Sequence, residues 1–162
     1  MTVASWAIGL GTLMVAEMLR LAGVAAAGAG TRRRSRTVAH LVTEGPFAWM
    51  RNPLYLGNGL AWAGVAIITG IQWLVPLGLA VFLIEYSLIV RYEEGVLESL
   101  FGETYLAYKR RTPRWVPKRP TPGPRPMGRG YDWPQAWRSE SSTFANLAVV
   151  IAVLAIKLAV TR

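Results

Sequence analysis

The sequence predicts an all-α integral membrane protein with about four membrane-crossing helices. Apolar residues make up 52% of the 162-residue chain and charged residues only 17%, against about 25% in an ordinary soluble domain. The apolar residues come in long blocks, as in membrane-spanning helices. Of the 18 basic residues, five lie in residues 31–53 and ten in residues 91–141. Basic loops that alternate with apolar blocks follow the positive-inside rule and predict both termini on the outer side.

The composition also excludes several classes of function. A net charge of +9 is compatible with nucleic-acid binding, but its confinement to two loops favours a membrane protein and predicts no nucleic-acid partner. The chain has no cysteine and a single histidine, His40. Disulfides and thiolate metal sites are therefore excluded, and we predict no metal site.

The first crossing helix is predicted over residues 3–29, a run long enough to span the hydrocarbon core. A signal peptide would carry its positive charge before the apolar run, whereas here four arginines follow it. We therefore expect a retained helix with residue 31 on the inner side. Glu17 and Arg20 are three residues apart and can pair on one helix face near the inner interface. We favour this local ion pair over a ligand contact.

Residues 54–90 are predicted to form a tight helical hairpin. As one helix they would extend roughly 55 Å, too long for a single crossing. Two helices of about 17 or 18 residues fit the lower limit for spanning. The stretch "TGIQW" (69–73) supplies the turn, and Pro76 falls in the first turn of the returning helix, where proline is tolerated. The hairpin brings "RNPLY" and "RYEE" to one membrane surface.

The rest of the chain predicts a surface helix, an irregular segment and a last crossing helix. Residues 93–109 show an apolar face at three- and four-residue spacing, which predicts an interfacial helix that Gly102 can divide. Residues 112–134 are rich in proline, glycine and arginine and are expected to be irregular. Residues 143–160 are apolar enough to cross. Without repeats or linkers, we predict one domain over residues 1–162.

Two polar clusters flank the hairpin and are candidates for chemistry. In the first, Pro53 should hold Asn52 extended and begin a helix, whose free amides favour an anionic group. The second contains Glu93 and Glu94, which fit either a helix-start charge pattern or acceptors for a polyhydroxylated or cationic ligand. Arg51 and Arg91 each adjoin a cluster, and we predict that one of them orients an anionic group of a substrate.

These clusters resemble the two motifs of the isoprenylcysteine carboxyl methyltransferase and phospholipid methyltransferase superfamily. "GPFAWMRNPLYLGN" is similar to its Gly-Pro-Tyr…Arg-(His/Asn)-Pro-x-Tyr-x-Gly signature. "RYEEGVLESLFGETYLAYKRRTPRWVP" is similar to its Glu-Glu-x-x-Leu-x-x-x-Phe-Gly-x-x-Tyr-x-x-Tyr motif and the prolines that follow. The resemblance covers about residues 41–117, so the helix at 143–160 lies beyond the shared core. It implies a multi-helix membrane enzyme that uses S-adenosylmethionine.

The resemblance carries over residue by residue. Asn52 stands where many members have histidine, which excludes a role that needs imidazole. The resemblance and the polar clusters together nominate ten cofactor-binding residues: Asn52, Pro53, Tyr55, Leu56, Gly57, Asn58, Glu93, Glu94, Tyr105 and Tyr108. Arg51 and Arg91 are the candidate catalytic residues. A helix start suits the cofactor's carboxylate, acidic side chains suit its diol or ammonium group, and aromatic faces such as Tyr55, Tyr105 or Trp115 suit its sulfonium.

The predicted function is methyl transfer from S-adenosylmethionine, which leaves S-adenosylhomocysteine, to a lipid or lipid-like acceptor at the membrane interface. A phospholipid amine and an isoprenoid or other carboxylate both remain open as acceptors. We expect the bacterial inner membrane, with the active site on the cytoplasmic side. The alternatives are a membrane reductase of sterol-reductase-like architecture that uses NADPH, and a non-enzymatic membrane lipid-binding protein. Membrane lipids are the expected surroundings, and the oligomeric state stays open.

Overall fold

The regular structure of the protein is helical in a computed structural model that describes residues 2–28, 40–71, 73–120 and 130–160. This confirms the predicted all-α class. The helices in chain order are α1 (Val3–Ala27), α2 (Pro46–Trp49), α3 (Pro53–Thr69), α4 (Leu74–Phe101), α5 (Glu103–Arg111) and α6 (Trp133–Val160). The predicted arginine run at 32–36 and part of the predicted irregular segment, residues 121–129, lie outside the described residues.

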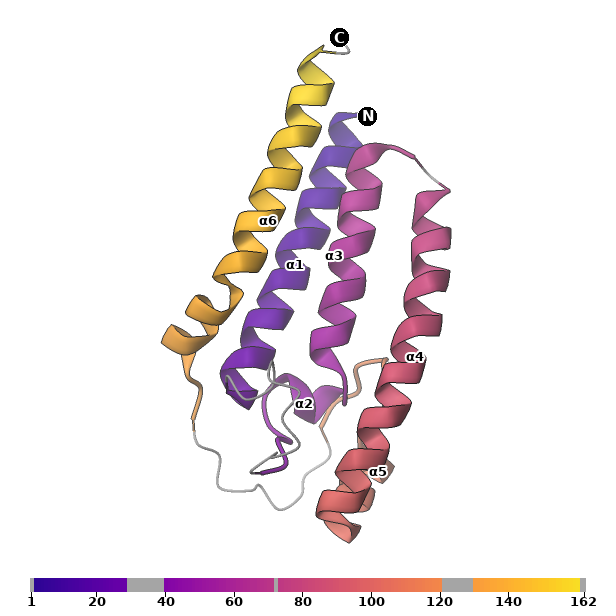
Figure 1. Cartoon of the computed structure of the whole chain (residues 1–162), viewed down its shortest axis with the longest axis vertical. Coiled ribbons are helices and arrows are strands. Elements are labelled where there is room, and N and C mark those ends of the chain that lie inside the picture. Colours follow the sequence, from indigo (N-terminus) through magenta and orange to yellow (C-terminus); the bar gives the residue numbers. More distant parts are fainter. Residues whose placement is uncertain (1, 29–39, 72, 121–129, 161–162) are drawn as a thin grey trace.

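Three of these helices, α1, α4 and α6, are long and apolar enough to cross a membrane. The apolar helix α3 has 17 residues, which corresponds to roughly 25 Å and lies near the lower limit for spanning. The four long helices run side by side and alternate in direction, so that both termini lie at one end of the bundle (Figure 1). The short helices α2 and α5 lie at the opposite end, together with both predicted motifs.

Small residues bring α1 and α3 into close contact. A Cβ atom added at Gly64 would lie 2.9 Å from the carbonyl oxygen of Gly9, and one added at Gly57 would lie 3.1 Å from that of Ala16. Only glycine permits this backbone approach, which is the usual way in which helices pack in a bilayer. Gly57, nominated as a cofactor-binding residue, is therefore buried against α1.

The predicted hairpin is confirmed. Gly70 ends α3 with φ 71°, a left-handed conformation that glycine adopts without strain. The chain then enters α4 at Leu74, and Pro76 lies in the first turn of that helix. Lower in the hairpin, Phe82 packs against α3 at Gly59, where an added Cβ would lie 2.9 Å from the ring.

Two helix boundaries differ from the predictions. Helix α4 continues to Phe101, so residues 93–101 extend the crossing helix, and only α5 after Gly102 is a separate piece. No proline interrupts residues 77–101, whereas Gly102 has φ 49° and breaks the helix. Helix α6 begins at Trp133 instead of 143 because the Asp132 carboxylate accepts a hydrogen bond from the Gln135 amide at 3.0 Å and caps the helix start.

Candidate active site at the ends of α3 and α4

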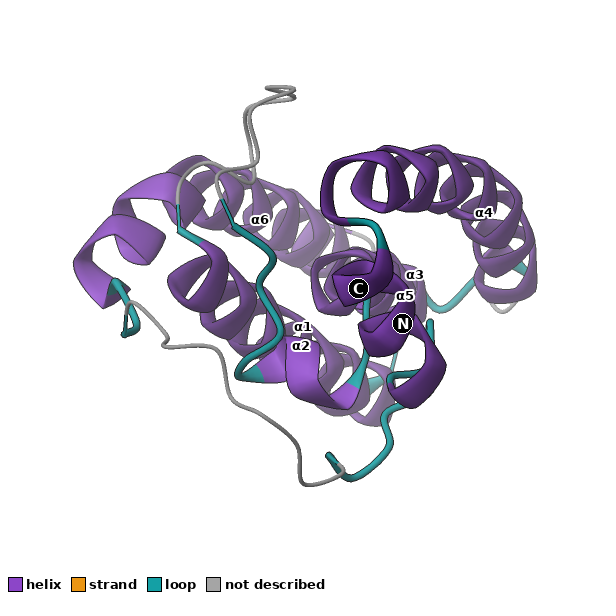
Figure 2. Ribbon diagram, turned by 90° about the horizontal axis from the view of Figure 1, so that it is seen from below, coloured by secondary structure: helices purple, strands orange, loops and turns teal. Residues whose placement is uncertain are grey.

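The two predicted motifs meet at the end of the bundle that lies opposite the termini. The Arg51 amide donates to the Pro113 carbonyl at 2.9 Å, and the Lys118 amide donates to the Trp49 carbonyl at 3.0 Å. These bonds join the segment before α3 to the segment after α5. Figure 2 views the bundle from this end, so that α2 and α5 lie in front of the long helices. The expected proximity of the motifs is therefore confirmed.

Glu94 is the centre of the first polar group. It is only 5% exposed. Arg51 donates from Nε to Oε1 at 3.1 Å, and Arg114 donates from Nη2 to Oε2 at 2.6 Å. The Lys109 Nζ lies 3.7 Å from Oε2. We call Arg51, Glu94, Lys109 and Arg114 the Glu94 cluster. Both carboxylate oxygens are occupied by protein cations, so this geometry does not support the nomination of Glu94 as a direct ligand of the cofactor.

Arg51 is committed to the same cluster. Its Nη1 donates to the carbonyl oxygens of Lys109 at 2.8 Å and Thr112 at 3.0 Å, and its side chain is only 10% exposed. These contacts cross-link α4, α5 and the following loop. The nitrogens of Arg51 are directed into the protein, which favours a structural role, and the prediction that Arg51 or Arg91 orients an anionic group of the substrate stays a prediction. The hydrogen bond from Arg114 to Glu94 raises the pKa of Arg114.

Three further nominated residues hold this packing together. The Asn52 amide donates to the Arg114 carbonyl at 3.1 Å, and its ψ of 56° differs from the predicted extended conformation. Tyr105 is 1% exposed and Tyr108 3%. The Tyr108 hydroxyl donates to the Phe47 carbonyl at 2.8 Å. Burial, and after it the Glu94 carboxylate, raises the pKa of Tyr105 to about 12. Both tyrosines are packed inside the protein, and their nomination as cofactor-binding residues stays a prediction.

A second polar group lies on the facing sides of α3 and α4. The Tyr55 hydroxyl donates to Glu93 Oε1 at 2.6 Å, and the Tyr55 ring lies 4.8 Å from the Tyr86 ring, centroid to centroid. The Asn58 Nδ2 donates to the Tyr86 hydroxyl oxygen at 3.0 Å. We call Tyr55, Asn58, Tyr86 and Glu93 the hairpin cluster. Glu93 is exposed, and Tyr55 is its one hydrogen-bond donor among the described residues. This carboxylate is therefore open to a ligand.

The remaining nominated residues divide between buried and exposed positions. Pro53 is less than 2% exposed and, like Gly57, lies on the α1 side of α3. The nomination of both as cofactor-binding residues stays a prediction. Leu56 is half-buried in the first turns of α3. Arg91 is exposed on α4 and forms no ion pair with a described residue. Of the two candidate arginines, only Arg91 is therefore presented to solvent or lipid.

Sequence reasoning missed Tyr86, which supplies an aromatic face and a hydroxyl to the hairpin cluster. Tyr86 lies inside a strongly apolar stretch, so the sequence predicts it only as one residue of a membrane-crossing helix. The available signal was its spacing of seven residues from Glu93, two helical turns, which places both on one face of α4. Phe82, one turn earlier, lies 4.4 Å from the Tyr86 ring and 6.2 Å from the Trp115 ring.

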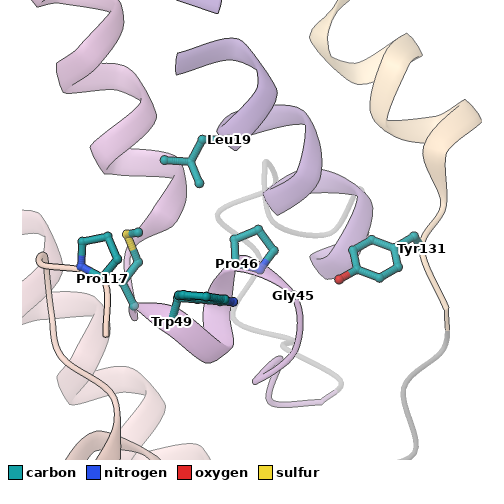
Figure 3. Close-up of a pocket in the computed structure, with 7 residues that line it drawn as sticks. Leu19, Gly45, Pro46, Trp49, Pro117 and Tyr131 are labelled. Atoms are coloured by element: carbon teal, nitrogen blue, oxygen red, sulfur yellow. The ribbon is translucent and has the colours of Figure 1, made fainter. Parts of the chain in front are cut away.

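An apolar pocket of about 430 Å³ opens beside α2 (Figure 3). Its lining residues come from α1, α2, the segment before α6 and the loop after α5: Leu19, Gly45, Pro46, Trp49, Met50, Pro117 and Tyr131. The Tyr131 hydroxyl packs against Gly45, which has φ 56°, so both conformation and space require glycine there. None of the nominated polar residues lines the pocket. Its size is within the range of small-molecule sites.

Metal chemistry has no support in the described part of the chain, where no group of three histidine, cysteine, aspartate or glutamate side chains could hold an ion. The chain can instead be compared with known proteins. Residues 1–104 match the profile of the family described as phospholipid methyltransferase. No solved structure matches the chain.

Three relatives illustrate the similarity. The cobalt-zinc-cadmium resistance protein CzcN of Cupriavidus metallidurans is 35% identical over 78 residues, 48% of this chain and 36% of the relative. Protein-S-isoprenylcysteine O-methyltransferase of Xenopus laevis is 31% identical over 118 residues, 68% of this chain and 40% of the relative. The same enzyme of Mus musculus is 33% identical over 123 residues, which cover 70% of this chain and 42% of the relative. The chain thus spans well under half the length of these relatives.

Proposed function

This chain belongs to the phospholipid methyltransferase family, and on that premise we propose that it transfers a methyl group from S-adenosylmethionine to a lipid or lipid-like acceptor at the membrane interface. The observation that carries the proposal is the meeting of the two motifs, which places an exposed carboxylate beside two tyrosine rings at the end of a membrane hairpin. This combination fits a small cationic cofactor better than it fits a structural anchor.

The residues of the hairpin cluster fit S-adenosylmethionine, which supplies an electrophilic methyl group on a sulfonium cation. The open carboxylate of Glu93 can accept hydrogen bonds from the cofactor's ammonium group or ribose hydroxyls. The rings of Tyr55 and Tyr86 present faces that attract a cation. The start of α3, beyond Asn52, is the positive end of the helix dipole and favours a carboxylate. These groups bind and orient the donor, and positioning supplies much of the catalysis in such a transfer.

The acceptor proposed is amphiphilic, with its polar end at the site and its apolar chain in or near the membrane. Two of the relatives named above are protein-S-isoprenylcysteine O-methyltransferases, and the family name specifies phospholipids. Both substrate classes combine an apolar chain with a polar group. The pocket beside α2 can bury part of such a chain. Arg91, exposed near the hairpin cluster, is proposed to face the carboxylate or phosphate of the acceptor.

The test uses purified protein in detergent. We expect binding of S-adenosylhomocysteine in calorimetry, and methyl transfer from radiolabelled S-adenosylmethionine to either phosphatidylethanolamine vesicles or N-acetyl-S-farnesylcysteine. A parallel titration with NADPH addresses the reductase alternative. Saturable NADPH binding without S-adenosylhomocysteine binding would reject the methyltransferase. A protein that binds neither compound would favour the non-enzymatic alternative.

The membrane orientation is proposed to place the site on the cytoplasmic side of a bacterial inner membrane. Both termini lie at the other end of the bundle, and the basic residues concentrate at the site end. Because the chain has no native cysteine, Pro120→Cys gives a single label position. In intact cells we expect no reaction with an impermeant maleimide, and full reaction after the inner face is made accessible. Labelling of intact cells would reverse the orientation.

A further inference from the structure

A series of hydrogen-bonded polar side chains crosses the interior of the bundle from α6 to the candidate site. Arg20 on α1 donates from Nη2 to Glu140 Oε2 on α6 at 2.6 Å and lies 3.6 Å from Glu17 on its own helix. Through Nη1 it donates to Asn58 Oδ1 on α3. Glu140 is fully buried. Ionised groups among crossing helices are costly and mark functional positions, and the predicted Glu17–Arg20 pair is part of this larger arrangement.

Arg20 determines which way the Asn58 amide points. A guanidinium group has only hydrogen-bond donors, so the Asn58 atom that faces Arg20 must be the oxygen Oδ1. The Nδ2 group of Asn58 is then directed to Tyr86, where it donates to the hydroxyl oxygen at 3.0 Å. The Tyr86 oxygen therefore accepts a hydrogen bond, and its own proton must be directed elsewhere. Arg20 therefore sets the direction of both hydrogen bonds: Arg20 donates to Asn58, and Asn58 donates to Tyr86.

The Tyr86 hydroxyl proton is consequently available at the candidate site. The Tyr86 ring is held between the rings of Phe82 and Tyr55, whose centroids lie 4.4 Å and 4.8 Å from its own. This packing fixes the position of the hydroxyl. Within the described residues the Tyr86 hydroxyl donates to no protein acceptor. A half-buried donor without an acceptor costs free energy, and a bound ligand can remove that cost.

We propose that the Tyr86 hydroxyl donates a hydrogen bond to an oxygen atom of the bound substrate or cofactor, and that Arg20 is the positioning residue that keeps this proton available. The inference rests on the proposed methyltransferase function and adds one binding residue and one positioning residue to it. The oxygen belongs either to S-adenosylmethionine or to the methyl acceptor, and the measurements below distinguish the two.

The test compares two substitutions that remove the same proton by different routes. Tyr86→Phe keeps the ring between Phe82 and Tyr55 and removes the hydroxyl. Asn58→Asp keeps an oxygen toward Arg20 but replaces the donor Nδ2 with a second acceptor, so the Tyr86 proton turns toward residue 58. We expect each variant to lose roughly three- to tenfold in ligand affinity or turnover, the value of one hydrogen bond. The double variant should lose no more than either single variant.

Two readouts identify the ligand oxygen. A weaker affinity for S-adenosylhomocysteine in calorimetry assigns it to the cofactor. An unchanged affinity with a higher KM for N-acetyl-S-farnesylcysteine, or slower methylation of phosphatidylethanolamine vesicles, assigns it to the acceptor. Tyr92→Phe is the matched control, because Tyr92 is 70% exposed on the same helix, and it should behave as wild type. If Tyr86→Phe also behaves as wild type in both assays, the inference is overturned while the methyltransferase function stands.

A second pair of variants tests whether Arg20 acts by orienting Asn58 or only by holding α6 against α1. Glu140→Gln removes the charge pair with α6 but leaves the contact from Arg20 to Asn58, so ligand affinity and KM should stay near wild type. Arg20→Met combined with Glu140→Leu and Glu17→Gln removes Arg20 and both carboxylates that pair with it, so no buried charge is left and the Asn58 amide is free to rotate. This triple variant should reproduce the Asn58→Asp phenotype. If Glu140→Gln is equally impaired, Arg20 acts only through α6. A wild-type protein with no cofactor binding or methyl transfer would reject both proposals.

Discussion

Glu93 and Glu94 are neighbours in the sequence but lie in two different regions of the molecule. Glu94 is 5% exposed and is held by Arg51, Lys109 and Arg114. Glu93 is exposed, and among the described residues it accepts a hydrogen bond from the hydroxyl of Tyr55. Successive helix positions point about 100° apart, so one turns toward the loop after α5 and the other toward α3. An acidic pair in a motif can thus divide into a buried, ion-paired carboxylate and an exposed one.

The two regions also differ in their stiffness and in their expected sensitivity to mutation. The Glu94 cluster joins α4, α5 and both loop segments through buried, charge-assisted hydrogen bonds. The hairpin cluster connects α3 to α4, contacts α1 through the hydrogen bond from Arg20 to Asn58, and keeps one carboxylate open. We therefore expect substitutions in the first region to lower stability and those in the second to lower ligand affinity with little effect on stability.

The largest effect is predicted for Glu94→Ala. It leaves the cations of the Glu94 cluster without a counter-charge, and breaking a buried pair typically costs about 3–5 kcal/mol. The variant should show a clearly lower Tm in detergent and lose all activity together with its fold. Glu98→Gln is the control, because that carboxylate is 37% exposed and, among the described residues, pairs with Lys109 alone. The stability of this variant should change by less than about 1 kcal/mol. A stable Glu94→Ala protein with no affinity for S-adenosylhomocysteine would show that Glu94 takes part in cofactor binding.

The next effect is predicted for Glu93→Gln. Loss of one charge-assisted hydrogen bond should weaken S-adenosylhomocysteine binding by about 1.5–3 kcal/mol, measured by calorimetry. The Tm should remain that of wild type because the side chain is exposed. Glu103→Gln, whose side chain is 84% exposed on α5, serves as the control for a general loss of negative charge. Unchanged affinity in Glu93→Gln would place the cofactor away from the hairpin cluster.

Arg51→Lys should have an intermediate effect, confined to stability. Lysine keeps the charge beside Glu94 but cannot also donate to the carbonyls of Lys109 and Thr112. We expect a loss of about 1–2 kcal/mol in unfolding free energy, with the affinity of the folded fraction for S-adenosylhomocysteine preserved. The opposite pattern, full stability with lost turnover, would support the prediction that Arg51 orients the acceptor.

The smallest effect is predicted for Arg91→Ala. An exposed arginine that meets an anionic group contributes on the order of 1 kcal/mol or less, since water and salt screen it. The KM for the acceptor should rise a few-fold, more at low salt than at high salt, while Tm and cofactor affinity stay constant. Arg110→Ala is a matched control, being 68% exposed and paired with Glu103 outside the site. Equal kinetics in both variants would leave Arg91 without a role in acceptor binding.

Several features follow from local sequence alone. The hairpin was predictable because hydropathy, the turn residues at 69–73 and Pro76 are all local signals, and the structure confirms it. The break at Gly102 was predictable for the same reason. The start of α6 was not predicted, because the apolar run begins only at residue 143. The cap at Asp132 is a single hydrogen bond, and the preceding residues are rich in proline and glycine, which predicts irregular structure.

What the sequence by itself determined is the all-α membrane class, the alternating topology and the meeting of two polar motifs, because these depend on periodicity and chain order. Only the tertiary structure decided which nominated residues are buried and which are exposed. Arg51, Tyr105 and Tyr108 carry the same side chains whether buried or open, and their burial depends on how α5 and the following loop fold back. The link from Arg20 to Glu140 joins residues 120 positions apart. No local signal encodes such a contact, since it exists only once α1 and α6 pack together.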